Sequence, residues 1–212
     1  MSIRRNVLAY LSEQKRDFIK AFQQPAAYPV GVQHPAQSSR SHPVASWSWD
    51  RGASGQNAFI RTVEASHKEY WARLGFGGYR DGFLSFLDRE QGVTKSSIPS
   101  QLHADHLLNS GFALRRGLMY VRLALVEGEI NVGYGRKIEK NLTRSEAQNK
   151  SQYLFDYIVL MKALNIEPPR DPEDFRRRRE EIASRIVSEG AEKRELVLEG
   201  LDGTFKLWDV LT

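Results

Sequence analysis

The absence of cysteine constrains this chain of 212 residues more than any other single feature of its sequence. Without cysteine there are no disulfides, no thiolate zinc sites and no cysteine nucleophile. The fold must therefore be held by a hydrophobic core, and the length suits one medium domain, or one domain with an extension. The hydrophobic fraction of 41% and the charged fraction of 27% are those of an ordinary globular protein.

The balance of charge favours a polyanionic partner only weakly. A net charge of +5 and a pI near 9.4 are compatible with nucleic acid or with an anionic membrane surface, although many basic proteins bind neither. No run of about 18 apolar residues predicts a transmembrane segment. Arg4 and Arg5 are typical of a signal peptide, but charged residues from Glu13 to Asp17 interrupt the apolar part, which argues against Sec-type export.

Composition divides the chain into three parts. Residues 1–23 place apolar side chains at three- and four-residue spacing, which predicts an amphipathic helix packed on the domain, on a partner or on a membrane surface. Residues 24–56 are rich in proline and serine and are expected to form an extended arm or linker, with Trp47 and Trp49 docked on the domain after it. Residues 57–212 are expected to form the catalytic domain.

The fold class predicted for this chain is α+β. We expect a mainly helical domain with a central β-hairpin near the candidate site, in which 119–126 and 130–134 are strands joined by a Glu-Gly-Glu turn, and a C-terminal β-hairpin around Asp202-Gly203. The Gly-Phe-Gly-Gly segment at 75–78 lacks the lysine and hydroxyl of a phosphate loop and is interpreted as a turn. Helices are expected over 57–73, 79–89, 145–164 and 172–189.

The densest cluster of reactive side chains runs from His103 to Asn109, in the sequence His-Ala-Asp-His-Leu-Leu-Asn, and Asn131 follows beyond an apolar segment. Metal-assisted hydrolysis needs an oxygen ligand for the cation, an imidazole that takes a proton from water, and an amide that orients the imidazole. Each residue also has a structural interpretation. His106 can be a hydrogen-bonded core residue, Asn109 a helix cap, and Asn131 a turn residue.

The pair Asp105-His106, followed by Asn109 and then Asn131, resembles the His-Me finger (HNH-type) nucleases, and more loosely the domains at the ends of bacterial polymorphic toxins. The resemblance covers about a fifth of the chain. It implies a ββα fold in which His106 is the general base, supported by Asn109, and Asp105 is a metal ligand. Asn131 would be a second ligand or an orienting group, and His103 would play a supporting role.

The resemblance also implies a cofactor, partners and a location. The cation would be divalent, Mg²⁺ or Mn²⁺, with Zn²⁺ on a His-rich site as the alternative. The substrate would be nucleic acid, and an immunity protein or a secretion adaptor would be the protein partner. Such an effector acts in a bacterial cytoplasm, after delivery into a target cell by a system that needs no signal peptide.

Two features of the sequence depart from the family pattern. No final histidine follows the expected hairpin, so the metal site would rest on one aspartate and one asparagine. In addition, residues 100–116 can form one continuous helix instead of a strand and a loop, which would place His103 and His106 on one helical face and remove the ββα geometry. A histidine-rich metal site on a helix would then be the remaining alternative.

Basic side chains near the motif are the candidates for binding substrate phosphates. Gly133 and Gly135 would let the backbone approach a phosphate. The alternative, without phosphate binding, is a flexible loop with solvated charges. Arg176–Arg179 lie among carboxylates and are expected to form a salt-bridged helix surface. The candidate phosphate-binding residues are Arg115, Arg116, Arg122, Arg136 and Lys137.

Three functions remain open from the sequence. The first is a metal-dependent nuclease that cleaves DNA or RNA and acts as a toxin or effector. The second is a non-enzymatic basic module that binds nucleic acid or protein through salt-sensitive contacts. The third is a hydrolase of another phosphate or ester substrate, although the chain has no G-x-S-x-G elbow or Walker loop.

Overall fold

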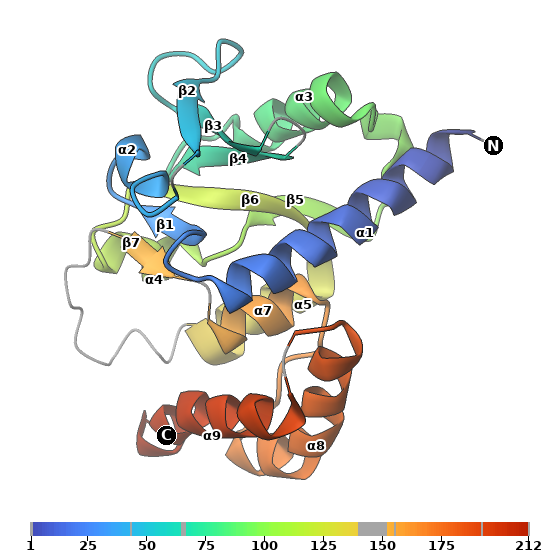
Figure 1. Cartoon of the computed structure of the whole chain (residues 1–212), viewed down its shortest axis with the longest axis vertical. Helices are drawn as coiled ribbons and strands as arrows, with labels where there is room; N and C mark the ends of the chain where they lie inside the picture. The colour runs from blue at the N-terminus through green and yellow to red at the C-terminus, as the bar shows by residue number, and fades with distance from the viewer. Residues whose placement is uncertain are drawn as a thin grey trace.

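The computed structural model describes residues 2–42, 44–64, 67–139, 152–154, 156–191 and 193–211, and it shows a curled antiparallel sheet with helices on both faces (Figure 1). The α+β class is therefore confirmed. The strands are β1 (Pro29–Val32), β2 (Ser46–Trp49), β3 (Ala58–Glu64), β4 (His67–Arg73), β5 (Leu102–His106), β6 (Tyr120–Glu127) and β7 (Gln152–Leu154). The helices are α1 (Ser2–Gln23), α2 (Pro35–Ser38), α3 (Tyr79–Gln91), α4 (Ser110–Arg115), α5 (Gly128–Tyr134), α7 (Tyr157–Ala163), α8 (Pro172–Ser188) and α9 (Arg194–Leu211), with a 3₁₀ turn η1 (Lys95–Ser97) and a π-helical turn η2 (Gly135–Glu139).

Strand β6 organises the sheet. Its first half pairs with β4 and β1 within the strand order β2-β3-β4-β6-β1-β7, and its second half pairs with β5, which lies off this path; all these pairings are antiparallel. Because β6 is buried from Tyr120 to Val126, it is apolar almost throughout, as the Val- and Leu-rich sequence predicts. The register aligns Asp105 with Ala124 and His106 with Leu123, so the motif lies at the end of a paired strand.

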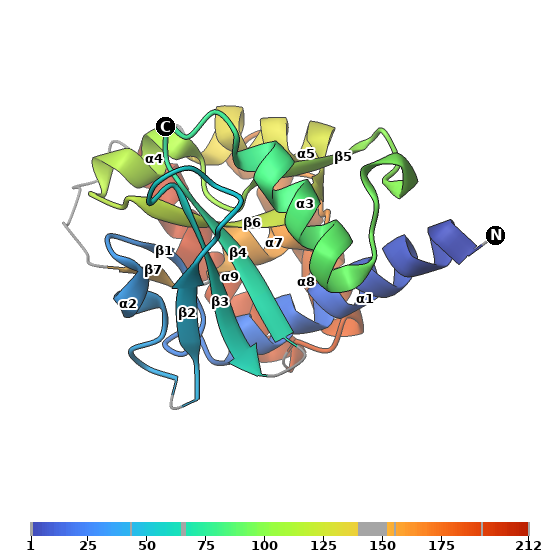
Figure 2. The same ribbon diagram turned by 90° about the horizontal axis from the view of Figure 1, so that it is seen from above.

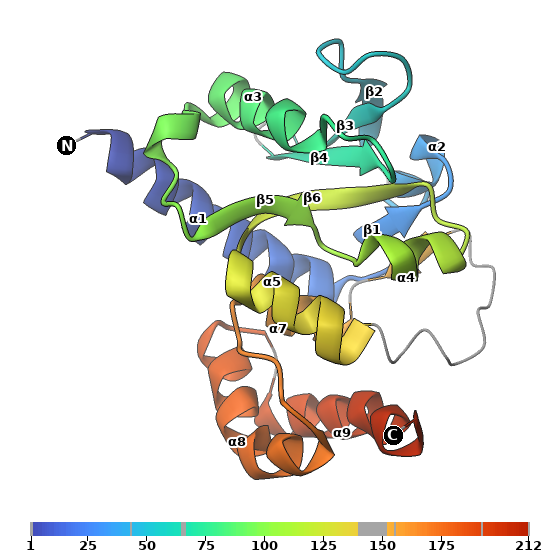
Figure 3. The same ribbon diagram turned by 180° about the vertical axis from the view of Figure 1, so that it is seen from behind.

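Side chains of β6 divide between two cores. Leu123 and Leu125 pack with α3, whereas Ala124 and Val126 belong to the larger core that includes α1, α7, α8 and α9. Figure 3 shows α3 over one face of the sheet and α5 and α7 over the other, with α8 and α9 as an outer layer, and Figure 2 shows the molecule from the side of α3. Because successive side chains of a strand point to opposite faces of the sheet, the side chains of β5 divide in the same way. Asp105 faces α5 and His106 faces α3.

Helix α1 confirms the amphipathic prediction for the N-terminus and packs along the sheet (Figure 1). Val7, Phe18 and Ile19 are buried on its inner face. The amide of Gln14 donates to the Leu125 carbonyl at 2.9 Å and accepts from the Leu125 N–H at 3.0 Å. The Gln14 side chain therefore pairs the N–H and the carbonyl of Leu125, which would otherwise be buried without hydrogen bonds on this edge of β6.

The proline- and serine-rich stretch contributes two strands to the sheet. Strand β1 lies between β6 and β7, and β2 pairs with β3. Trp47 and Trp49 dock as predicted, because both indoles pack edge-on against Phe59, at 6.1 and 6.3 Å between ring centroids.

The helix predicted over 57–73 is wrong, because this segment forms the hairpin β3–β4. Its apolar residues fit both a 3.6 and a 2.0 period, and cross-strand partners decide between them. Phe59 stacks on Trp71 at 5.4 Å, and the buried side chains of Arg61 and Glu69 pair directly across the hairpin. Such pairs stabilise a sheet and cannot form within one helix of this sequence.

The central hairpin predicted at the Glu-Gly-Glu segment is also wrong, because β6 leads directly into helix α5. Helix α5 begins at Gly128, which packs against the imidazole of His103. A Cβ at position 128 would lie 2.4 Å from that ring, too close for any residue but glycine unless the ring moves. Ile130 and Tyr134, four residues apart, are both buried on the helix's inner face. Asn131 therefore lies on a helix and not on the strand that the sequence pattern predicts.

The predicted C-terminal hairpin is replaced by helix α9, which packs on α8. Val197, Leu201 and Phe205 recur every four residues and are buried, and Phe205 stacks on Phe175 of α8 at 4.0 Å. Asp202-Gly203 is absorbed into the helix, where Asp202 pairs with Arg179. Tertiary burial of one apolar stripe thus overrides a strong local turn signal.

The remaining predicted helices are mostly confirmed. Those over 79–89 and 172–189 correspond to α3 and α8, and a left-handed Gly92 ends α3. The helix predicted over 145–164 begins only at Tyr157, after Asp156 caps it by accepting from the Val159 N–H, and 152–154 form β7. Residues 145–151 lie outside the described part of the chain. None of the helices described is long and apolar enough to cross a membrane.

Candidate functional site

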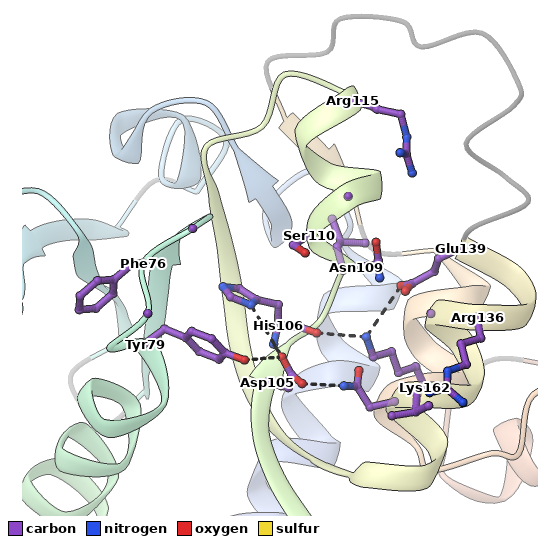
Figure 4. Close-up of a pocket in the computed structure, with 17 residues that line it drawn as sticks. Phe76, Tyr79, Asp105, His106, Asn109, Ser110, Arg115, Arg136, Glu139 and Lys162 are labelled. Atoms are coloured by element: carbon purple, nitrogen blue, oxygen red, sulfur yellow. Dashed lines mark hydrogen bonds and ion pairs between the residues drawn. The ribbon is translucent and has the colours of Figure 1, made fainter.

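Four polar residues of the sequence motif, Asp105, His106, Asn109 and Asn131, line a cleft of about 740 Å³ (Figure 4). Its walls come from the end of β5, the start of α4, the loop before α3, and the helix formed by α5 and η2, with Lys162 of α7 between them. Segments far apart in the sequence therefore meet at one place. The lining residues with polar groups of chemical interest are Tyr79, Asp105, His106, Asn131, Glu139 and Lys162.

Asp105 is held by four donors, which come from β5 itself, α3 and α5. Its Oδ1 accepts from the backbone N–H of His106 at 2.8 Å and from the Tyr79 hydroxyl at 3.2 Å. Its Oδ2 accepts from the Asn131 amide at 2.7 Å and makes a longer contact of 3.5 Å with Arg80. The aspartate and the distant asparagine of the motif thus touch directly, because α5 follows β6 and covers the face of β5 from which Asp105 projects.

These contacts keep Asp105 ionised. Burial raises the pKa of the carboxyl, but the side chain and backbone of His106, together with the charge of Lys162, outweigh burial and lower the pKa to about 2. The cleft therefore contains a fixed negative charge at neutral pH.

His106 projects from the opposite face of β5 and is 8% exposed. Its ring packs against Tyr79, with 4.5 Å between centroids, and its Nδ1 lies 3.8 Å from Asp105 Oδ1. Nε2 is buried and has no hydrogen-bond partner among the residues that the structure describes. The nearby carboxylate favours a proton on Nδ1, which leaves the lone pair of Nε2 available to accept another.

Asn109 has a clear structural role, since its Oδ1 caps α4 by accepting from the Phe112 N–H at 3.1 Å. Its Nδ2 is directed toward Gly135, where a Cβ would lie only 3.3 Å away. Asn109 therefore lines the cleft and fixes the entry into α4, and its side-chain oxygen is committed to that helix instead of to the imidazole of His106.

Two buried ionisable side chains, Lys162 and Glu139, form the inner end of the cleft. Lys162 Nζ donates to the backbone carbonyl of His106 at 3.1 Å and lies 3.8 Å from Glu139 Oε1. Burial lowers the pKa of Lys162 and raises the pKa of Glu139. Neither Glu139 oxygen has a direct hydrogen-bond partner within the described ranges.

The structure separates the five basic candidates. Arg115 and Arg136 line the cleft with exposed side chains, and Lys137 is not among the lining residues. Arg116 lies over the ring of Phe112 at 4.6 Å. Arg122 is buried beside Glu69 at 2.9 Å, away from the cleft lining.

His103 also lies outside the cleft lining, on the exposed outer part of β5 beside Gly128. Of the motif, therefore, the structure brings together Asp105, His106, Asn109 and Asn131 and leaves His103 apart. The continuous helix considered for 100–116 is not formed, because β5, a short loop and α4 occupy that range.

The sequence pattern does not identify Tyr79, Lys162 and Glu139 as cleft residues. Tyr79 comes from a helix more than twenty residues before the motif, and only the fold brings it to Asp105. Lys162 does have a sequence signal, since it is the lone cation in the apolar run from Tyr157 to Leu164, where an inward-facing charge needs a partner.

The cleft has two side chains with the oxygen ligands that a hard divalent cation takes, Asp105 and Asn131, and as placed the amide nitrogen of Asn131 faces the carboxylate. Within the described residues there is no group of three or more His, Asp or Glu side chains that could hold a metal. An ionised carboxylate and an adjacent amide nevertheless offer the hard oxygen ligands that Mg²⁺ and Mn²⁺ prefer, once the Asn131 amide turns its oxygen toward Asp105.

The chain matches no protein-family model, no curated protein and no solved structure. The cleft itself is therefore the basis for a functional assignment.

Proposed function

We propose that this protein is a metal-dependent nuclease that hydrolyses phosphodiesters of DNA or RNA. The observation that carries the proposal is the contact of Asp105 with Asn131, beside His106, in one cleft. These are the residues on which the resemblance to His-Me finger nucleases rests. They come from a strand end and a later helix that the sequence separates by about 25 residues.

The order of the elements supports the same proposal. Strand β5 pairs with β6, and α5 follows β6 directly, which is the ββα order implied by the resemblance. The helix at 128–134, where a strand was expected, therefore favours the proposal, since it carries Asn131 back to the end of β5. The missing final histidine leaves this site with one carboxylate and one amide as cation ligands.

The chemistry follows from the contacts of each residue. His106 accepts a proton from the attacking water, with Asp105 holding its ring charge and Lys162 anchoring its backbone. Asp105 Oδ2 and the Asn131 amide would hold Mg²⁺ or Mn²⁺. When bound there, the cation would neutralise charge that builds on the phosphate. Arg115 and Arg136, both at the cleft, would bind neighbouring phosphates.

The biological setting is a proposal that depends on the same resemblance. A nuclease of this kind would act as an antibacterial toxin or effector in a bacterial cytoplasm, delivered without a signal peptide. An immunity protein or secretion adaptor would then be its partner. A charged cleft rimmed by Arg115 and Arg136 would be the surface that an inhibitor has to cover.

The test is cleavage of plasmid DNA and of structured RNA in Mg²⁺ or Mn²⁺. His106→Ala is expected to lower the rate by about 10²-fold or more, because it removes the general base. His103→Ala is the matched control, since His103 lies on the same strand but outside the cleft. Equal rates for the two variants, or intact substrate with every metal, would reject the proposal.

The same assay separates the alternative, a non-enzymatic basic module. That alternative predicts salt-sensitive binding of nucleic acid without turnover, weakened by Arg115→Ala or Arg136→Ala and unaffected by His106→Ala.

A further inference from the structure

The proposed hydrolysis needs a proton donor as well as a base. When water attacks phosphorus, the bond from phosphorus to the leaving oxygen breaks, and that oxygen departs as a strongly basic alkoxide unless it receives a proton. His106 lies on one wall of the cleft, with Tyr79 behind it, whereas Glu139 lies across the cleft on η2 (Figure 4). The two groups thus flank the space in which a diester would lie.

The helix wall presents Glu139 to the cleft in line with Asn131. Asn131, Gly135 and Glu139 recur every four residues along α5 and η2, and all three line the cleft. Gly135, between the other two, has no side chain, and a Cβ there would lie 3.3 Å from Asn109 Nδ2 and 3.9 Å from Glu139 Oε2. The wide π-helical turn ends at Glu139, and such turns inside helices are frequent at functional sites.

The Glu139 carboxyl is unusual because it is 2% exposed and no hydrogen bond of normal geometry reaches either oxygen in the described part of the chain. The backbone N–H of Asn109 lies near enough to lower its pKa without meeting that geometry. A buried carboxylate in a purely structural role is normally saturated with donors. Lys162, the nearest cation among the described residues, lies 3.8 Å away and donates a hydrogen bond to the His106 carbonyl instead.

Burial, more than the charges on neighbouring elements, favours the neutral form of Glu139, because the largest of those charges, on Lys162, lowers its pKa. Burial raises the pKa of Glu139 most, and Asp156 at the start of α7 and Asp105 at the end of β5 raise it further. Lys162 and the backbone N–H of Asn109 act in the opposite direction without reversing the shift. One carboxyl of the cleft thus has a lowered pKa and the other a raised pKa, a division typical of acid–base sites.

From this placement we infer that Glu139 is the general acid, the group that gives its proton to the leaving oxygen on the wall opposite His106. This inference rests on the proposed nuclease function. In the step, water loses a proton to His106, its oxygen bonds to phosphorus, and the leaving oxygen takes the Glu139 proton. The products are a phosphate monoester and an alcohol, and exchange with solvent restores both side chains.

The test compares two substrates that differ in their need for an acid. One is an oligonucleotide, whose alkoxide leaving group needs a proton. The other is a nucleotide p-nitrophenyl diester, whose phenolate leaves without one. Glu139→Gln is expected to slow oligonucleotide cleavage by about 10²-fold or more, while cleavage of the aryl diester changes by less than about threefold. The retained aryl activity also shows that the variant is folded.

The pH profile gives an independent readout. For the wild type with the oligonucleotide, kcat/KM should fall at high pH as Glu139 loses its proton, and Glu139→Gln should remove this basic limb. His106→Ala is the contrasting variant, because loss of the base should slow both substrates.

Each outcome decides the inference. Equal loss on both substrates by a folded Glu139→Gln variant, or no loss on either, overturns it and leaves the nuclease proposal intact. If the variant does not fold, a series of aryl diesters with the wild type decides: a weak dependence of rate on leaving-group basicity supports proton donation, and a steep one overturns it. If the wild type cleaves no diester, the nuclease proposal itself fails.

Discussion

Glu69 and Glu139 are both buried glutamates next to cations, yet their surroundings have opposite effects. Glu69 of β4 lies 3.0 Å from Arg61 and 2.9 Å from Arg122, and it accepts from the Trp71 indole at 3.1 Å. Burial opposes its charge, but the two guanidinium groups outweigh burial and hold the pKa of Glu69 well below its usual range. For Glu139, one ammonium group at 3.8 Å is not enough, and burial raises the pKa.

The difference shows that burial alone does not make a carboxyl reactive. What decides is whether enough positive charge and enough donors surround the carboxylate to outweigh burial. Around Glu69 they do, and the network connects β3, β4 and β6 beneath Phe18 of α1, whose ring lies 5.1 Å from Arg122. Around Glu139 they do not, and the group lines a cleft. We therefore infer that Glu69 stabilises the sheet, whereas Glu139 has the role in the cleft that we propose for it.

The largest expected effect comes from breaking the first network. Glu69→Gln removes a charge that compensates two buried guanidinium groups, and we expect it to lower the free energy of unfolding by about 3–5 kcal/mol. Urea denaturation at pH 7 measures this. Glu139→Gln is the matched control with the same chemical change, and its loss should stay below about 1 kcal/mol, because burial already disfavours the charge of Glu139 and no guanidinium group pairs with it in the described part of the chain. Equal losses for the two variants would remove the distinction.

A second effect tests the same network through pH. His67 lies 2.9 Å from Asp17 and 3.5 Å from Glu69. Burial opposes the protonated ring, but hydrogen bonds to these two carboxylates raise the pKa of His67 to about 9 from the ordinary 6.5. Because the folded value is the higher one, the stabilisation is complete below pH 6.5 and is lost as pH rises through 9. It amounts to roughly 3 kcal/mol.

Unfolding free energies measured from pH 6 to 10 check this expectation. The wild type should lose stability across the interval, and His67→Gln should remove most of that slope. A decline of the same size in the variant would show that other groups, and not the contact of His67 with the Glu69 network, control alkaline stability.

The structure also shows how far local sequence determines the fold. Helices α1, α3 and α8 and strand β6 could be predicted because each has one clear period or composition. The segment 57–73 could not, since its apolar spacing suits a helix and a strand equally. At 127–134 the packing of Gly128 against His103 selects a helix over the predicted strand. At 196–208 a helix forms because it buries the stripe of Val197, Leu201 and Phe205. Both contacts depend on partners that are distant in the sequence.

In the candidate site, too, local features could be predicted from the sequence and contacts between distant segments could not. Asp105 and His106 could be recognised because they are neighbours in the chain. Their contacts with Tyr79, Asn131 and Lys162 depend on the pairing of β5 with β6 and on the helices at the two faces. Glu139 could not be predicted, because its character comes from missing donors around it in the described part of the folded chain.

The smallest expected effect comes from an exposed ion pair, in contrast to the buried pairs of Glu69. Arg80 lies 3.5 Å from Asp105, but its side chain is 58% exposed, so water and salt screen the pair. We expect Arg80→Ala to change the free energy of unfolding by less than about 0.5 kcal/mol. Thermal or urea denaturation at low and high salt measures the change. A loss close to that of Glu69→Gln would mean that Asp105 depends on Arg80 for its charge. The ionised state of Asp105 would then depend on its exposed contact with Arg80, and its contact with His106 and the charge of Lys162 would no longer explain it.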